Sequence, residues 1–420
     1  MLISALIQAD WLRHRPQRRL KRLINQEWSL SVPSRKAGQE DPLTSKLSGS
    51  RFKVQSSPMK SENGEPIRLG NTFFSMPTPC KKIVIEKPGG YERFRFDNTP
   101  LEDPGPAEIQ IEVKACGINF ADISVRLGLY AAAKGSYPLC PGLEFSGVVR
   151  CVGTQVRGYK PGDSVFGVSR FGGYATVMNC PKGHLWSLPD TWDFKKGASF
   201  PVAYLTADYA LHAVGNLKKA DQVLLHSAAG GVGTALLHLL KINGNVSVGV
   251  VSGAGKVAAA KAAGAAFIID KSSEDLWKRA EAFVPQGYDL ILDANGASTL
   301  KQSYLHLKPT GRLLIYGFAS MFSHSGRRNY LKLIWYYLRT PRFSPFDLTG
   351  SNKTVSGFNL IYLFDRAELF RNIMDRLLAL DRHGNIPQMP ITEFAFEDVA
   401  EAHKAIESGR TAGKLVLLPK

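Results

Sequence analysis

The chain has 420 residues, of which 44% are hydrophobic and 21% are charged. One hydrophobic core stops growing at about 250–300 residues, so this length and composition predict an ordinary globular protein with two domains. The net charge of +17 suits an anionic cofactor or an acidic membrane surface. The basic residues form no dense stripe, which argues against a nucleic-acid-binding protein.

The chain contains five cysteines, and none forms a C-x-x-C pair. Their scatter indicates neither a disulfide framework nor a cysteine zinc site. No run of about 18 or more residues is apolar throughout, so we expect no transmembrane helix.

Residues 1–75 are expected to be a basic leader or extension. Residues 1–24 combine apolar and basic side chains with a single acid, Asp10, as mitochondrial presequences do. Residues 29–75 are polar and rich in Ser, Pro and Lys, which predicts disorder. The alternative is that Met76 starts the enzyme and that everything before it is a non-native extension. We therefore expect a cytoplasmic or mitochondrial protein that does not span a membrane.

Residues 76–200 are predicted to form a mostly β domain. Apolar and polar residues alternate at 109–115, as in a half-buried strand, and residues 82–85 and 94–96 indicate two further strands. Glycine stands at nearly every corner of the stretch that follows. Residues 198–211 are expected to form the helix that joins this domain to the next.

Residues 223–237 contain a short apolar strand, a glycine-rich turn and the start of a helix. Bare glycines let backbone N–H groups approach a pyrophosphate, and the helix start adds unpaired donors. The strict fingerprint G-x-G-x-x-G appears here as Ala228-x-Gly230-x-x-Gly233. The turn therefore predicts dinucleotide binding, and the alternative is a tight strand-to-helix turn of any α/β protein.

The end of the next strand, residues 246–251, distinguishes NAD from NADP. NAD-binding proteins usually place Asp or Glu there, about 20 residues beyond the glycines, to bind the ribose 2′-hydroxyl. This chain has Ser252 and then Lys256, with no acid between them. Because a 2′-phosphate would be attracted by Lys256, NADP(H) is favoured; the alternative is a solvated lysine.

Further strands alternate with helical segments, at residues 267–270, 289–293 and 311–317. This alternation predicts an α/β fold with a doubly wound parallel (Rossmann) sheet, over residues 201–345. Ligands bind beyond the carboxyl ends of such strands. Asn295, Gly296, Tyr316 and Gly317 are therefore expected to line the nicotinamide ribose.

The β-rich block resembles the GroES-like catalytic domain of the medium-chain dehydrogenase/reductase superfamily, in its zinc-free quinone oxidoreductase branch. The likeness rests on residues 116–122, 141–149 and 158–175. Zinc-dependent members place a cysteine where this chain has Asn119 and a histidine where it has Leu143. Amide and aliphatic side chains cannot replace those ligands, so the resemblance implies no catalytic metal.

The resemblance also implies roles for single residues. Asn119 would donate its amide to the substrate or the nicotinamide, and Tyr130 would bind or protonate the substrate; the alternatives are a turn amide and a packed aromatic side chain. Residues 346–420 would return to the catalytic domain and bring Lys414 to the cofactor. The residues expected to bind the cofactor are Asn119, Thr206, Ala229, Gly230, Gly231, Val232, Ser252, Lys256, Asn295, Gly296, Tyr316, Gly317, Phe358 and Lys414.

Residues 327–342 are predicted to include an amphipathic helix. Leu331, Ile334, Trp335 and Leu338 share one helical face, and the flanks are basic and aromatic. Such a helix could lie on an anionic membrane surface, or its apolar face could pack on its own protein or on a dimer partner. This insertion resembles the vesicle amine transport protein subfamily of the quinone oxidoreductases.

Together these features predict an NADPH-dependent oxidoreductase that transfers hydride to a quinone or an α,β-unsaturated carbonyl without zinc. Conjugation in such an acceptor delocalises charge and reduces the need for a metal. The alternative is a membrane-associated binding or lipid-handling protein that retains the reductase fold. A homodimer is expected by analogy with the fold alone.

Overall fold

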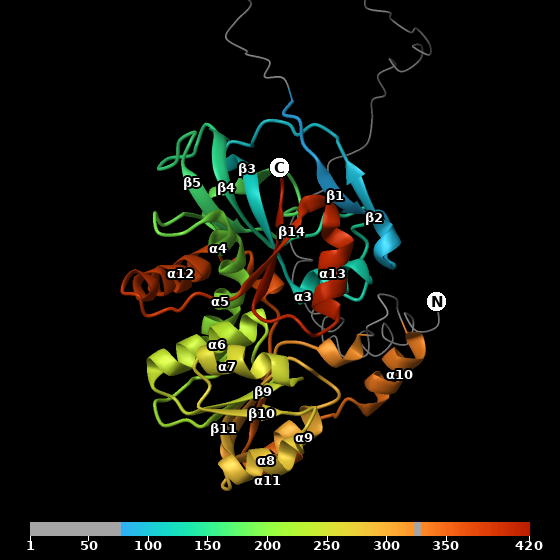
Figure 1. The fold of residues 1–420 in the computed structure, drawn as a ribbon, viewed down its shortest axis with the longest axis vertical. Helices are drawn as coiled ribbons and strands as arrows, with labels where there is room; N and C mark the ends of the chain where they lie inside the picture. Colours follow the sequence, from blue (N-terminus) through green and yellow to red (C-terminus); the bar gives the residue numbers. More distant parts are fainter. Residues whose placement is uncertain (1–76, 323–328) are drawn as a thin grey trace, which may run out of the picture. The chain divides into compact units, whose positions relative to one another are not determined.

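The computed structural model describes residues 77–322 and 329–420. They belong to one unit of the chain, and Figure 1 shows their fold. The expected leader, residues 1–75, lies outside the described residues.

The first sheet has seven strands in the order β14-β15-β3-β4-β5-β7, and β6 pairs with β3. Ile109, Ile111 and Val113, the apolar positions of the predicted alternation, are all buried in β3. This is the GroES-like, mostly β part of the predicted fold. Its strands are β3 Glu108–Ile118, β4 Glu144–Val152, β5 Ser164–Val168, β6 Val177–Pro181, β7 Leu185–Ser187, β14 Ile391–Ala395 and β15 Lys414–Leu418.

Smaller elements accompany this sheet. The strands β1 Lys82–Ile85 and β2 Phe94–Asp97 form an antiparallel pair. Two helices, α3 Phe120–Arg126 and α13 Val399–Glu407, come from distant parts of the chain and contact each other.

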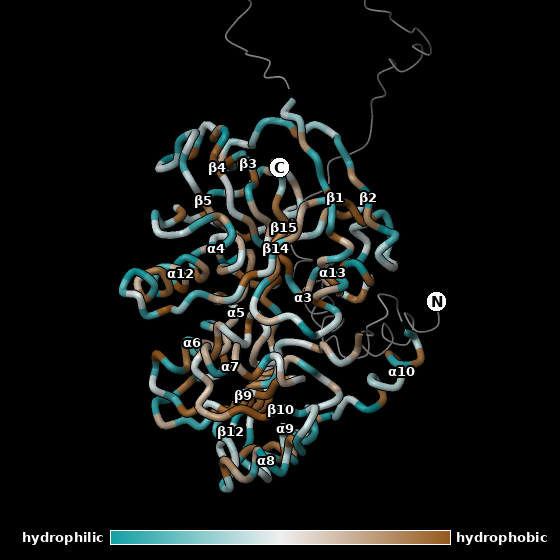
Figure 2. Tube along the Cα trace, in the orientation of Figure 1, coloured by the Kyte–Doolittle hydropathy of each residue, from teal (hydrophilic) through white to brown (hydrophobic). Residues whose placement is uncertain are grey.

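The second sheet has six parallel strands in the order β10-β9-β8-β11-β12-β13. Figure 2 shows β9 and β10 in the brown of hydrophobic residues, as expected for strands covered on both faces. The strands are β8 Val223–Leu225, β9 Ser247–Val251, β10 Phe267–Asp270, β11 Tyr288–Asp293, β12 Leu307–Ile315 and β13 Thr354–Gly357. The predicted α/β fold with a Rossmann-like sheet is therefore confirmed.

The last strand of this sheet, β13, lies beyond residue 345, where we expected the nucleotide-binding region to end. Beyond β13, the chain forms α12 Ala367–Arg382 and then returns to the first sheet as β14 and β15. The helices between the parallel strands are α6 Gly231–Asn243, α7 Val257–Ala262, α8 Leu276–Phe283 and α9 Leu300–Leu305.

The two sheets share one hydrophobic core. Phe166 and Trp186 of the first sheet belong to the same buried cluster as Leu225 and Leu236 of the second. The segment between the sheets supplies much of this cluster, as α4 Phe194–Ser199, α5 Pro201–Asp208 and a π-helical turn Tyr209–Val214. Buried side chains, and not the backbone alone, therefore join the two sheets.

A pair of short helices, α10 Tyr330–Arg339 and α11 Pro345–Ser351, stands between β12 and β13. Neither helix contains a buried residue. Among the described residues, no helix has the length and apolar character needed to cross a membrane.

Candidate functional site

A cleft of about 710 Å³ lies along the carboxyl ends of the parallel strands, where ligands of such sheets bind. Residues that follow all six strands line it. In the spatial order of the strands, these include Lys271, Ser252, Ser227, Asn295, Tyr316 and Phe358. Residues of the first sheet and α3 form the opposite wall, so the cleft has the volume and the place of a small-molecule site.

The glycine turn brings the first N–H groups of α6 to this cleft. Gly230, Gly231 and Gly233 all line it. A Cβ atom on Gly233 would stand 2.2 Å from the Ser227 carbonyl oxygen, and one on Gly231 would stand 2.6 Å from Cδ of Lys414. Gly233 therefore requires glycine, because backbone atoms would block a Cβ, whereas a Cβ on Gly231 would displace the Lys414 side chain. No side chain caps α6, so its first N–H groups can bind an anion.

Lys256 and Lys271 line the same end of the cleft, after β9 and β10. Burial, and then the charge of Lys271, hold the pKa of Lys256 below its usual value. Burial also lowers the pKa of Lys271, and the carboxylate of Asp293 opposes that effect. An anion bound between the two lysines would relieve both unfavourable effects.

At the other wall, Asn119, Glu144 and Lys414 form a buried cluster, with exposed fractions of 9%, 0% and 4%. The Asn119 amide donates to Oε1 of Glu144 at 2.8 Å, and Nζ of Lys414 donates to Oδ1 of Asn119 at 2.8 Å. Lys414 also forms an ion pair with Glu144 and donates to the Ile118 carbonyl at 2.9 Å. The Asn119 side chain is thereby held in one orientation, with one N–H of its amide left over.

Asp122 fixes the backbone beneath Asn119. Its carboxylate accepts from the Asn119 N–H at 2.8 Å and from the Gly142 N–H at 3.0 Å. Burial raises the pKa of Asp122 to about 6, and these two hydrogen bonds partly oppose that rise. Asp122 thus orients the loop that presents Asn119.

Tyr130 stands at the end of the cleft where β13 ends. Its hydroxyl donates to Oδ1 of Asn359 at 2.8 Å. Burial raises the pKa of Tyr130 above its ordinary value, so the phenol keeps its proton at neutral pH. The ring of the neighbouring Phe358 packs edge-on against Tyr209, with 4.9 Å between ring centres.

The apolar part of the cleft wall includes Phe120, Leu143, Phe318 and Phe322. The rings of Phe120 and Phe322 meet edge to face, with 5.1 Å between their centres. Such a wall suits a flat, conjugated molecule.

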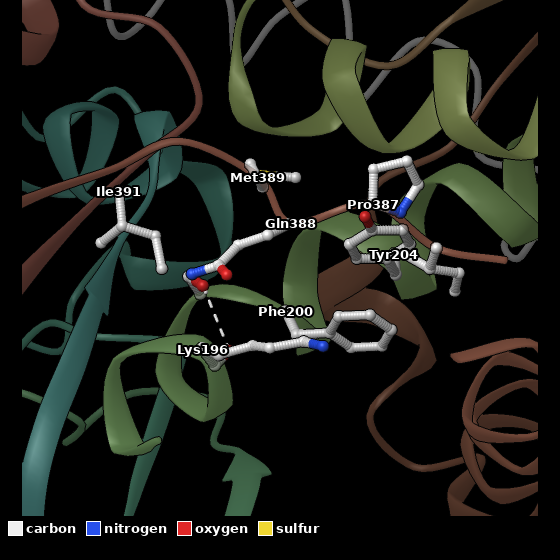
Figure 3. Close-up of a pocket in the computed structure, with 9 residues that line it drawn as sticks. Lys196, Phe200, Tyr204, Pro387, Gln388, Met389 and Ile391 are labelled. Atoms are coloured by element: carbon white, nitrogen blue, oxygen red, sulfur yellow. Dashed lines mark hydrogen bonds between the residues drawn. The ribbon is translucent and has the colours of Figure 1, made fainter. Parts of the chain in front are cut away.

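A second, much smaller cavity of about 10 Å³ lies where α4 and α5 meet residues 386–391. Figure 3 shows Phe200, Tyr204 and Met389 among its lining side chains. A space of that size holds one water molecule at most, so it is a packing defect and not a substrate site.

Two family models match the chain, that of the zinc-binding dehydrogenases over residues 263–417 and that of the alcohol dehydrogenase GroES-like domain over residues 105–190. The synaptic vesicle membrane protein VAT-1 homolog of Mus musculus is 33% identical over 343 residues, which cover 81% of this chain and 84% of that protein. The chain belongs to the medium-chain dehydrogenase/reductase superfamily.

Solved structures place the chain within this superfamily. The Escherichia coli quinone oxidoreductase complexed with NADPH matches with a TM-score of 0.71 and 29% identity, over 81% of this chain and 100% of that one. A mycobacterial protein, also complexed with NADPH, matches with a TM-score of 0.70 and 28% identity, over the same shares. The predicted place in the quinone oxidoreductase branch, near the VAT-1 proteins, is therefore confirmed.

Most residues that the sequence assigned to the site line this medium-chain dehydrogenase/reductase cleft. They are Asn119, Tyr130, Thr206, Gly230, Gly231, Val232, Ser252, Lys256, Asn295, Tyr316, Gly317, Phe358 and Lys414. Ala229 and Gly296 are not among its lining residues. Ala229 is buried, and its carbonyl accepts from the Gly413 N–H at 2.8 Å. Gly296 forms the turn after β11, with a φ of 80°.

Sequence reasoning missed two lining residues on α10, Lys332 and Tyr336. They are four residues apart, on the face away from the apolar stripe that drew attention to this helix. This spacing of four residues could have indicated a second, polar face of the helix.

One matched family is named for zinc, which proteins hold with Cys, His, Asp or Glu side chains. Asn119 offers an amide and Leu143 an aliphatic chain, and neither is a zinc ligand. Within residues 77–322 and 329–420, no three or more His, Cys, Asp or Glu side chains gather in a way that could hold a metal ion. The side chains of this cleft do not fit a catalytic zinc.

Proposed function

We propose that this protein is an NADPH-dependent oxidoreductase that reduces a quinone or an α,β-unsaturated carbonyl without a metal. The observation that carries this proposal is the cleft itself, which has anion-binding groups at one end and the clamped Asn119 amide in an apolar wall. The NADPH complexes of two structural neighbours support the choice of cofactor.

The described residues fit NADPH along the whole cleft. The N–H groups at the start of α6 would bind the pyrophosphate, and Lys256 and Lys271 would bind the 2′-phosphate. Asn295, Tyr316 and Gly317 would contact the nicotinamide ribose. When bound, the nicotinamide supplies a hydride, which is two electrons and one hydrogen.

Asn119 would stabilise the acceptor as it gains negative charge. Glu144 uses one hydrogen of the Asn119 amide, and the other can point to an acceptor oxygen. Glu144 and Lys414 act as positioning residues, since they hold this amide and do not need to touch the acceptor. The Tyr130 hydroxyl would turn from Oδ1 of Asn359 to deliver the proton that completes the reduction, and the solvent would reprotonate it.

Titration with NADPH and NADH tests the cofactor assignment. The protein, a Lys256→Ala variant and a Lys261→Ala control would be titrated while nicotinamide fluorescence is followed. Lys261 is an exposed lysine on α7 that does not line the cleft, so its loss should change nothing. A charge-assisted hydrogen bond contributes about 1.5–3 kcal/mol, so Lys256→Ala should weaken NADPH binding roughly ten- to hundredfold and leave NADH binding unchanged. Equal weakening for both nucleotides would contradict the phosphate site.

Chelation tests the metal-free reaction. We expect quinone reduction at an undiminished rate after prolonged treatment with dipicolinate, because the site has no side chains that hold zinc. One zinc per chain, lost together with activity, would overturn this part of the proposal.

The exposure of α10 favours a second function, contact with a membrane surface. Leu331, Trp335 and Leu338 are 81%, 55% and 72% exposed, so this apolar face does not pack on the described part of the chain. The guanidinium of Arg339 lies 5.2 Å from the centre of the Trp335 ring, which places a cation beside the apolar face. We propose that this face binds anionic lipid.

Sedimentation with vesicles that contain phosphatidylserine tests this second function. A Trp335→Ala/Leu338→Ala variant should stay in the supernatant and should reduce quinones as the wild type does. Should the variant instead change the mass measured by analytical ultracentrifugation, and not vesicle binding, the face would be a homodimer interface.

A further inference from the structure

The polar face of α10 forms part of the cleft wall. Lys332 and Tyr336 lie one helical turn apart, and both line the cleft. Nζ of Lys332 donates to the carbonyl of Phe322 and lies 5.5 Å from the centre of the Tyr336 ring. The helix that exposes its apolar face therefore directs a cation and a hydroxyl-bearing ring into the site.

Lys332 stands at the acceptor end of the cleft and not at the 2′-phosphate end. Its partner Phe322 follows β12 in the chain, and the Phe322 ring contacts Phe120, the neighbour of Asn119. Lys256 follows β9, and two strands separate β9 from β12 in the sheet. At about 4.8 Å per strand, the ends of β9 and β12 are roughly 14 Å apart.

The charged side chains that line the cleft differ in whether they form an ion pair. The charged lining residues are Lys256, Lys271, Lys332, Lys414 and Glu407. Glu144 pairs with Lys414, and Arg126 pairs with Glu407. Lys332 forms no ion pair with a carboxylate in the described part of the chain, and partial burial lowers its pKa. An anion from outside the chain would stabilise its charged form.

We propose that Lys332 and Tyr336 form an anion-binding subsite for the acceptor. The substrate is then a quinone or enone that carries a carboxylate or a similar anionic group away from its reactive carbonyl. This inference rests on the proposed function, because it names the substrate class of the same site. It adds a determinant of specificity on α10, outside both sheets.

Two quinones of matched shape test the subsite, neutral 9,10-anthraquinone-2-sulfonamide and anionic 9,10-anthraquinone-2-sulfonate. The kcat/KM of the full chain would be measured for each with NADPH, after subtraction of the rate without enzyme. Lys332→Gln should lower kcat/KM for the sulfonate about five- to tenfold and change that for the neutral quinone less than twofold. Lys332→Arg should retain the preference, and added salt should reduce it in the wild type.

Lys353 offers a matched control. Its Nζ also donates to backbone carbonyls, those of Tyr304 at 3.1 Å and Leu305 at 3.3 Å, and lies 5.1 Å from the Tyr304 ring centre. Burial lowers its pKa as well, but it does not line the cleft. Lys353→Gln should leave the ratio of the two kcat/KM values unchanged. An equal change of that ratio in both variants would show that the loss of any one positive charge has this effect, and it would overturn the proposal.

A binding measurement separates this inference from the proposed function. Calorimetry would compare naphthalene-2-sulfonate with the neutral naphthalene-2-sulfonamide, neither of which can be reduced. Loss of the preference for the sulfonate in Lys332→Gln supports the subsite even if no quinone is turned over. An unchanged preference overturns the subsite even if quinones are reduced.

Discussion

Replacing Lys414 with Met tests the buried cluster that holds Asn119. The Nζ of Lys414 donates to Ile118 at 2.9 Å and to Asn119 at 2.8 Å and pairs with Glu144. In the variant, the carboxylate of Glu144 remains fully buried without its cation. It keeps two hydrogen bonds of 2.8 Å, from the Asn119 amide and the Val202 N–H.

The expected loss follows from these contacts. Removal of one partner of a buried ion pair costs about 3–5 kcal/mol, because an uncompensated charge stays behind. The loss of a donor to Ile118 and Asn119 adds to this cost, and the two remaining hydrogen bonds to the carboxylate offset it. We therefore expect the free energy of unfolding to fall by about 3–5 kcal/mol, measured by urea titration at pH 7.

A second variant and a control make the result specific. Lys414→Met combined with Glu144→Gln removes both charges, so it should cost at least about 1.5 kcal/mol less than the sum of the single changes. Lys404, which pairs with Glu401 at the surface, is the control, and Lys404→Met should cost less than about 1 kcal/mol. A loss below about 1 kcal/mol in Lys414→Met, or additive losses in the double variant, would refute the reasoning.

Three further changes have outcomes that follow from the structure. Burial raises the pKa of Asp122 to about 6, so between about pH 4 and 6 this carboxyl is protonated in the native state and ionised in the unfolded state. The free energy of unfolding should therefore fall by up to about 3 kcal/mol as pH rises through that range. Asp122→Asn should lack this slope in denaturant titrations from pH 4 to 7, and an identical slope in both proteins would contradict the assignment. Gly233→Ala should destabilise the protein more than Gly231→Ala, because its Cβ would meet a backbone carbonyl oxygen and not a flexible lysine side chain. Both should weaken NADPH binding, which fluorescence titration can check. Trp335→Ala should change the unfolding free energy by less than about 1 kcal/mol, because the side chain is already 55% exposed; a larger loss would show that it packs in solution.

Features encoded by short stretches of chain were predictable. The glycine turn, the strand ends and the helix at 330–339 each follow from residues within about one turn of each other, so local patterns indicated them. The same locality placed Asn295 and Tyr316 in the cleft, because residues that follow parallel strands share one edge of the sheet.

Contacts between distant residues were not predictable from one sequence. Glu144 and Lys414 are 270 residues apart, and no local pattern joins them. The resemblance predicted Lys414 at the cofactor, and Lys414 lines the cleft, but no sequence pattern indicated that its Nζ contacts Asn119 and Glu144. The role of Lys332 depends on how α10 is oriented against the cleft, and the apolar stripe of that helix does not encode this orientation.

The place of β15 in the first sheet has a consequence for synthesis of the protein. β15 pairs with residues 116–118, which lead to Asn119, and it also carries Lys414. Apart from β14, the other strands of the first sheet are all translated by residue 187, long before translation reaches residue 414. At about 5–20 residues per second, this interval lasts roughly 10–45 s. The parallel sheet is complete by residue 357, so the side of the cleft that this sheet lines can form on the ribosome while the opposite side still awaits its last strand.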